Sequence, residues 1–215
     1  MINAIIFHAF YLLIWSLSHV FSVDQNLINH FSESKLVPEL IPEAPTELCH
    51  VTYSEYGVVQ PGSVLTDEQS FVQPSITWDA DPNSLYTLYW AGIASQRLVA
   101  TRSPDYEDMT YEDRIKTEYS IMVVVNIPGN NYSVGLDLWS YVPPGDPPVK
   151  KLRDRYAILI YKQQDTIVPP TKKIKYDEYE FQTFTPLIKF VKQYNLIGPV
   201  AGNMFYTQKD DNERI

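Results

Sequence analysis

The histidines of this 215-residue chain are confined to its first quarter. All four, His8, His19, His30 and His50, lie within the first fifty residues, and none follows. Imidazole is the usual general base of a Ser-His-Asp or Cys-His site and a common ligand of bound metals. The long C-terminal part of the chain therefore lacks the side chain that most hydrolytic sites and histidine-metal sites require.

Carboxylates remain as candidates for acid–base chemistry in that part of the chain. The candidates are Asp79, Asp81 and Asp154. Asp79 and Asp81 stand in the stretch WDADPNS, where Asp more often bends or caps the chain than reacts. We therefore predict no enzymatic activity and expect neither a cofactor nor a metal.

Cysteine content and charge exclude further classes. Cys49 is the only cysteine, so no disulfide can form within the chain. It is predicted to be a small buried hydrophobe, with a reactive thiol or an intermolecular bridge as alternatives. The net charge of -9 argues against a nucleic-acid partner, because neutralising phosphates requires clustered Lys and Arg.

The first segment of the chain has the character of a targeting signal. Residues 2–21 are almost continuously apolar, and no Lys or Arg precedes Lys35. Val20 and Ser22 are small enough for a signal-peptidase site, which predicts a cleaved signal peptide and a secreted, extracellular protein without a stable membrane anchor. The alternative is a retained signal anchor, because the stretch approaches the ~20 residues that span a bilayer.

One modification motif matters in a secreted protein. Asn131-Tyr132-Ser133 matches the N-x-S/T sequon and lies in the turn-rich stretch PGNNYS. This pattern predicts N-glycosylation at Asn131, with an unmodified turn residue as the alternative.

The elements that would position a site are mainly strands. Seven runs are rich in Val, Ile, Tyr and Thr and are separated by Gly, Pro, Asn or Asp: VTYSEYGVV, SVLT, SITWDA, LYTLYWAGIA, EYSIMVVVNIPG, DLWSYV and RYAILIYKQQ. Two of them, YSIMVVVNI and RYAILIYK, show little alternation, which indicates strands covered on both faces. One late helix is predicted from the helical spacing of apolar residues in FTPLIKFVKQYNL. The pattern favours a predominantly antiparallel β core with a late helix.

Domain organisation follows from the same pattern. We predict a signal peptide over 1–22, a Pro-containing lead-in over 23–47 with no more than one helical turn, and one domain over 48–211. Within that domain, the charged residues 101–118 are predicted to form a solvated acidic insertion.

Five segments, in their order along the chain, resemble one known family. They are SVLTDEQSFVQPSITWDA, LYTLYW, EYSIMVVVNIPGNNYSVG, SYVPPGDPP with the following RYAILIYKQQ, and NLIGPVAGNMF. Together they resemble the phosphatidylethanolamine-binding protein family. The resemblance implies a mainly β fold in which a large central antiparallel sheet packs against a smaller sheet, with a few peripheral helices. It also implies a small surface pocket for an anion, such as the phosphate of a phospholipid headgroup.

The pocket motifs of that family are altered in this chain. Where the family has the two acids of an Asp-Pro-Asp-Ala-Pro turn, Gly92 and Ala94 stand here, and Ile121 and Asp154 replace its two histidines. Ile121 cannot donate a hydrogen bond, and an ionised Asp154 would repel a phosphate. Each lost charged donor costs an anion about 1.5–3 kcal/mol of binding free energy.

By family position, the pocket would be lined by Gly92, Ala94, Tyr119, Ile121, Asp154, Arg155, Tyr156 and Phe205. An ion pair that supports the sheet is the alternative role for Arg155. A shift in the Pro/Gly loop would instead bring Arg153 to the position of Asp154.

The function predicted from these features is that of a secreted, non-enzymatic binding protein. Its pocket has changed away from phosphate and would take a small apolar or lipid-like ligand. Two alternatives remain open. One is a protein-interaction module, such as a serine protease inhibitor or signalling modulator, and the other is a structural module like the related mitochondrial ribosomal protein.

Overall fold

The structure is a computed structural model that describes residues 24–94, 118–145, 147, 152–168 and 186–209. The predicted signal peptide and nearly all of the predicted insertion at 101–118 lie outside the described residues. Within the described ranges, no helix is both long enough and apolar enough to cross a membrane.

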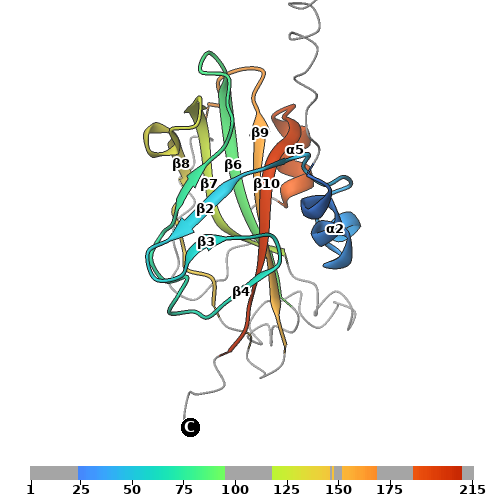
Figure 1. Cartoon of the computed structure of the whole chain (residues 1–215). Coiled ribbons are helices and arrows are strands. Elements are labelled where there is room, and N and C mark those ends of the chain that lie inside the picture. Colours follow the sequence, from blue (N-terminus) through green and yellow to red (C-terminus); the bar gives the residue numbers. More distant parts are fainter. Residues whose placement is uncertain (1–23, 95–117, 146, 148–151, 169–185, 210–215) are drawn as a thin grey trace, which may run out of the picture.

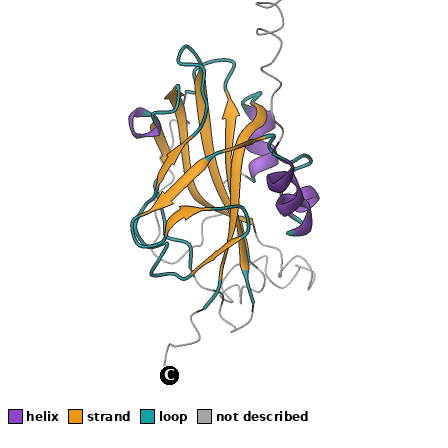
Figure 2. Ribbon diagram, in the orientation of Figure 1, coloured by secondary structure: helices purple, strands orange, loops and turns teal. Residues whose placement is uncertain are grey.

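A seven-stranded sheet forms the centre of the molecule (Figures 1 and 2). Its strand order is β1-β10-β9-β6-β7-β8, and β4 also pairs with β10. The strands are β1 (Glu47–Leu48), β4 (Ser63–Leu65), β6 (Leu85–Ile93), β7 (Glu118–Pro128), β8 (Leu136–Trp139), β9 (Asp154–Lys162) and β10 (Ile197–Thr207). The sheet is mixed rather than purely antiparallel, because β1 and β4 both pair with β10 in parallel.

A three-stranded sheet covers one face of the large sheet, and helices cover the other (Figure 1). The small sheet has the order β3-β2-β5. Its strands are β2 (His50–Tyr53), β3 (Gly57–Val59) and β5 (Ser75–Thr77), and the helices on the other face are α2 (Gln25–Glu33), α3 (Leu36–Glu39) and α5 (Leu187–Gln193). The short 3-10 helix η2 (Tyr132–Val134) lies on the small-sheet side, where Tyr132 packs against the core of that face. The prediction of a large sheet, a smaller sheet and a few helices is confirmed.

Each face of the large sheet contributes to its own apolar core. Along β9, Tyr156 and Ile158 face the small sheet, whereas Ala157 and Leu159 face the helices, and all four are fully buried. Side chains alternate between the faces of a strand, so a strand covered on both sides has to be apolar throughout. The lack of apolar–polar alternation in β7 and β9 thus arises, as predicted, because both faces of these strands are covered.

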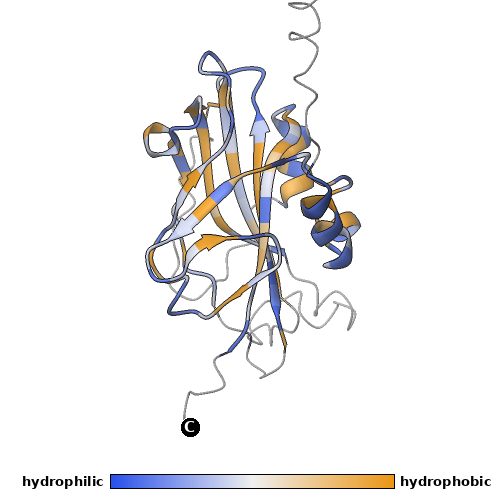
Figure 3. Cartoon of the chain, in the orientation of Figure 1, coloured by the Kyte–Doolittle hydropathy of each residue, from blue (hydrophilic) through white to orange (hydrophobic). Residues whose placement is uncertain are grey.

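Residues 24–41 form more structure than the sequence suggested. Instead of a single helical turn, the segment contains α2 and α3. The Asp24 carboxylate caps α2 by accepting a hydrogen bond from Leu27 N at 3.1 Å. Helix α2 combines hydrophilic with hydrophobic residues (Figure 3), and its buried residues, Leu27 and Phe31, pack in the core between the helices and the sheet.

The late helix forms where it was predicted. In α5, Leu187 and Phe190 are buried, and the chain turns out of the helix at Asn195, which has a left-handed φ of 48°. The Leu187 N–H donates to the Glu118 carboxylate of β7 at 2.7 Å. A strand residue therefore satisfies a backbone donor that the first turn of a helix leaves open.

Cys49 is a buried core residue, as predicted. Its side chain is fully buried, and burial raises the pKa of its thiol. The buried Asn203 amide of β10 donates to Cys49 O at 3.0 Å and to Val59 O at 3.1 Å. This amide ties the large sheet to the small one.

Candidate ligand site at one end of the large sheet

Four of the residues predicted to line a pocket lie in one row across the sheet. Gly92, near the end of β6, is the cross-strand partner of Tyr119 on β7 and of Tyr156 on β9. Tyr156 in turn is opposite Phe205 on β10. We call Phe205, Tyr156, Gly92 and Tyr119 the aromatic row.

The rings of the aromatic row pack against one another. Tyr156 and Phe205 are stacked, with ring centroids 5.2 Å apart, and the ring of Tyr119 meets that of Tyr156 edge-on at 5.9 Å. The ring of Tyr119 lies directly over Gly92, because a Cβ atom built on Gly92 would stand 2.6 Å from Tyr119 Cζ. The missing side chain of Gly92 is what makes room for this ring.

The hydroxyl groups at the row are used in internal hydrogen bonds. Tyr119 Oη donates to Tyr156 Oη at 2.6 Å, and Tyr156 Oη donates to Gly145 O at 3.1 Å. Thr207 Oγ1 donates to the same carbonyl at 2.9 Å. These donors, which could have faced an anion, instead bind one another or the loop that contains Gly145.

The loop over the row is held by further contacts. Val142 N donates to Ile121 O at 3.0 Å, and Tyr141 Oη donates to Ser70 O. The ring of Tyr141 packs on Trp90 with centroids 5.4 Å apart, and burial raises the pKa of Tyr141 to about 12. Trp90 lies two residues before Gly92 on the same face of β6, so the loop and the row belong to one aromatic cluster.

Three other predicted residues are buried near the row. Ile121 is 2% exposed, and it sits where the register between β6 and β7 shifts, so it joins the core that faces the small sheet. Asp154 is 5% exposed and pairs with Thr207 across β9 and β10. Ala94, just past the end of β6, is 1% exposed.

The side chain of Arg155 does not lie at the aromatic row. Its guanidinium reaches the helical side of the sheet, where Nη1 donates to Ser34 O at 2.8 Å and lies 2.9 Å from a Glu39 carboxylate oxygen. Arg155 thus has the supporting ion pair considered as its alternative role. Arg153 Nε donates to Gln208 Oε1 at 2.9 Å, and Asp154, not Arg153, is the partner of Thr207 in the strand register.

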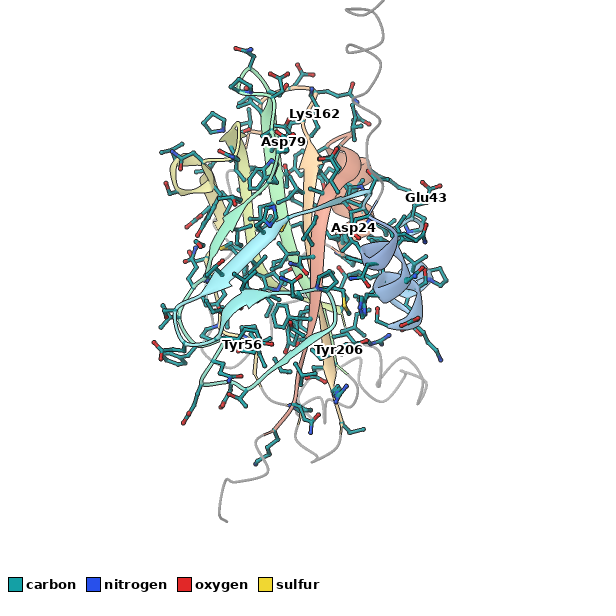
Figure 4. All side chains as sticks on the ribbon, in the orientation of Figure 1. Asp24, Glu43, Tyr56, Asp79, Lys162 and Tyr206 are labelled. Atoms are coloured by element: carbon teal, nitrogen blue, oxygen red, sulfur yellow. The ribbon has the colours of Figure 1, made fainter. Side chains whose placement is uncertain are left out.

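Of the three carboxylates considered for acid–base chemistry, Asp154 lies near the row, whereas Asp79 and Asp81 lie elsewhere. Figure 4 labels Asp79 near one end of the molecule and Tyr206, the neighbour of Phe205, nearer the other. Asp81 holds a turn by accepting from Asn83 N at 3.0 Å and from Ser84 Oγ at 2.8 Å, and these hydrogen bonds lower the pKa of its carboxyl. In the part of the chain that the structure describes, no three His, Cys, Asp or Glu residues are grouped to hold a metal ion.

Tyr141, Trp90 and Gly145 also belong to this region, although no sequence motif had indicated them as site residues. Trp90 and Tyr141 read as ordinary strand and loop aromatics. Only the spacing of two residues between Trp90 and Gly92 could have indicated that both face the same side of β6.

Two curated proteins are similar to this chain over most of its length. A Drosophila melanogaster protein named "Putative odorant-binding protein A5" is 28% identical over 188 residues, which cover 87% of this chain and 83% of that protein. The "26 kDa secreted antigen" of Toxocara canis is 30% identical over 179 residues, covering 83% of this chain and 63% of the antigen. No family model matches the chain.

Solved structures support the same relationship at the level of the fold. A carboxypeptidase Y inhibitor, solved in complex with its cognate proteinase, is 18% identical with a TM-score of 0.62, covering 89% of this chain and 98% of the inhibitor. A Plasmodium falciparum phosphatidylethanolamine-binding protein is 16% identical with a TM-score of 0.50, covering 84% of this chain and 96% of that protein. The two-sheet fold and these similarities show that the chain has the fold of the phosphatidylethanolamine-binding proteins, and its ordered sequence segments resemble that family.

Proposed function

We propose that this chain is a secreted, non-enzymatic binding protein that takes a small apolar or weakly polar ligand at the aromatic row. The observation that carries the proposal is the row itself. At the strand ends where the family resemblance implies an anion pocket, the described side chains are aromatic rings whose hydroxyl groups are already bound to one another or to Gly145 O. A phosphate would find no free donor in this row, whereas an apolar molecule would find ring faces.

The ligand would enter by displacing the ring of Tyr119 from Gly92. Tyr156 and Phe205 are fully buried, but Tyr119 is only half-buried. Its hydroxyl donates one hydrogen bond, to Tyr156, and such a bond contributes about 0.5–1.5 kcal/mol net. Because Gly92 has no side chain, backbone atoms would line the bottom of the space that the ring leaves.

A nearby donor fits a ligand that carries one oxygen acceptor. Trp90 is fully buried, and its Nε1–H has no hydrogen-bond partner among the described residues. Its ring contacts Phe205, with centroids 5.9 Å apart. A buried donor without a partner costs free energy, so a ligand carbonyl that reaches it would gain a hydrogen bond. We therefore favour aldehydes, ketones and esters over plain hydrocarbons.

The relatives support secretion and binding rather than catalysis. One of the two curated relatives is named as a secreted antigen and the other as an odorant-binding protein. The apolar first segment, with its signal-peptidase pattern, agrees with an extracellular location.

The test is ligand binding to the purified secreted protein. Native mass spectrometry and thermal-shift assays would compare medium-chain aldehydes, ketones, esters and hydrocarbons with inorganic phosphate and phosphoethanolamine. We expect the apolar series to raise the unfolding temperature and the phosphate compounds to leave it unchanged. Binding of phosphoethanolamine alone would overturn the proposal, and so would the absence of binding by every compound.

Two substitutions link that binding to the row. Tyr119→Phe removes the hydrogen bond that holds the ring, so apolar ligands should bind up to roughly tenfold more tightly. Tyr206→Phe, on the helical face of β10, is the matched control and should change nothing. Trp90→Phe should weaken binding of a ketone but not of a hydrocarbon of equal length.

A second candidate is a protein-interaction module of the inhibitor type. The observation that favours it is the exposure of Phe71 and Val72, at 68% and 54%, in the turn after β4. Ser70, the preceding residue, is bonded to the loop over the row through Tyr141 and Pro144. If proteinases bind this surface, Phe71→Ala with Val72→Ala should abolish inhibition in a proteinase panel while leaving small-ligand binding intact.

A further inference from the structure

In the described part of the chain, β8 is the last strand at one edge of the large sheet, and exposed apolar side chains lie there. β8 ends the strand order and, among the described residues, pairs only with β7. The unpaired backbone groups of such an edge can template pairing with a second chain. Val134, just before β8, and Leu136, its first residue, are 61% and 41% exposed.

The sequon Asn131-Tyr132-Ser133 immediately precedes these residues in the chain. Asn131 is exposed and is the N-cap of η2. Val134 N donates to Asn131 O at 3.3 Å, so the two residues lie at the two ends of one turn. A glycan on Asn131 would therefore begin one turn from the exposed Val134.

The turn that carries Asn131 is firmly held. Tyr132 Oη donates to Pro74 O at 2.7 Å, and Val134 N and Gly135 N donate back to Asn131 O and Tyr132 O at 3.3 and 3.1 Å. Gly135 packs so closely on the sheet that a Cβ atom there would lie 2.6 Å from a Val124 methyl carbon. A glycan on this turn would therefore stay near the β8 edge.

We propose that an N-linked glycan on Asn131 covers Val134, Leu136 and the open edge of β8, and keeps that edge from pairing with the β8 edge of a second copy. This inference rests on the proposed secretion, because the modification requires a lipid-pyrophosphate-linked oligosaccharide in the secretory pathway. The Asn131 amide nitrogen forms a bond to the anomeric carbon of the oligosaccharide. The bond from that carbon to the lipid pyrophosphate breaks, and the amide loses a proton.

The experiment compares glycan-bearing and glycan-free forms of the secreted full-length chain. Ser133→Ala removes the sequon, and Ser133→Thr keeps it as the matched control. Because Ser133→Ala could also disturb folding, wild-type protein with high-mannose glycans is trimmed after purification to a single sugar. Light scattering during gel filtration then gives the mass of each form over a concentration series.

We expect wild type and Ser133→Thr to shift in mobility on deglycosylation and to elute as single copies. Ser133→Ala and the trimmed wild type should shift towards the dimer mass as concentration rises. Adding Val134→Lys and Leu136→Lys to Ser133→Ala should restore the single-copy mass, because charge on an edge strand opposes pairing.

Two results would overturn the inference while leaving the proposed function intact: a secreted wild type that deglycosylation does not shift, or glycan-free forms that keep the wild-type mass at every concentration. Retention of all forms inside the cell would overturn the proposed secretion as well.

Discussion

Because Gly92 has no side chain, the ring of Tyr119 can pack directly on the backbone of β6. The ring of Tyr119 occupies the place of a Gly92 Cβ, and from there its hydroxyl reaches Tyr156. Loss of the acid at position 92 relative to the family motif thus makes room, and the ring of Tyr119 occupies it. The residues of the aromatic row are linked by contact and not only by their positions in the sequence.

Adding a methyl group at Gly92 should push the ring of Tyr119 away from the backbone of β6. Gly92→Ala places Cβ against the Tyr119 ring and should destabilise the protein by about 1–3 kcal/mol, the usual cost of overpacking a core. Gly145→Ala is the matched control, since nothing lies within 4 Å of its added Cβ. Urea unfolding measures both. An additive cost in the double variant Gly92→Ala/Tyr119→Ala would contradict the contact, because removing the ring should relieve it.

Sequence reasoning located these residues but not their arrangement. The order of motifs sufficed to place Gly92, Ile121, Tyr156 and Phe205 at one site. The position of the Tyr119 ring depends on a register shift between β6 and β7, and such irregularities leave little trace in a local pattern. Arg155 was assigned by its motif, but alternation along β9 turns it to the opposite face.

At the scale of elements, Glu118 couples the start of β7 to helix α5. Its carboxylate accepts from Leu187 N at 2.7 Å. Burial raises the pKa of this carboxyl above its usual value of 4.5, and the hydrogen bond from Leu187 N opposes the shift only in part. The ionised form of Glu118 is thus less favourable in the folded chain than in the unfolded one.

This shift predicts a pH-dependent effect of Glu118→Gln. A raised folded-state pKa gives stability that is present below the unfolded pKa and is lost as pH rises through the folded pKa. Gln cannot ionise and can still accept from Leu187 N, so the stability of the variant relative to wild type should increase as pH rises above 4.5, the usual pKa of the carboxyl. Chemical unfolding at several pH values measures the difference, with the exposed Glu68→Gln as a control for the lost charge. A difference that stays constant with pH would contradict the raised pKa.

Strand β10 was not predicted as a strand, and its sequence explains why. Strand β10 contains Gly198, Pro199 and Gly202, residues that usually argue against a strand interior. At Gly202 the reason is close packing: a Cβ atom would stand 2.7 Å from Pro45 and 2.9 Å from Ile158 O. Long-range contacts, invisible in a local window, thus select glycine inside a central strand.

At the scale of the whole molecule, residues 24–41 complete the core on the helical side. Leu27, Phe31 and Leu36 are fully buried against the sheet residues of that face. The prolines and polar residues of segment 24–41 favoured the prediction of a loose lead-in. A segment with few apolar residues gives a weak local signal, even when every one of those apolar residues is buried. Tertiary packing, more than intrinsic helix propensity, stabilises such short helices.

If this segment belongs to the cooperative fold, truncating one of its side chains should weaken the whole molecule. Phe31→Ala removes a ring with no exposed surface and should cost about 3–5 kcal/mol of unfolding free energy, as for other buried Phe residues. Phe71→Ala is the matched control, since that ring is 68% exposed and its loss should change stability by less than about 0.5 kcal/mol. Tryptophan fluorescence and circular dichroism should report one coincident transition for each variant. If α2 only adheres to a domain that begins at Leu48, Phe31→Ala would leave the main transition unchanged, and the packing of Phe31 against the sheet would contribute nothing to global stability.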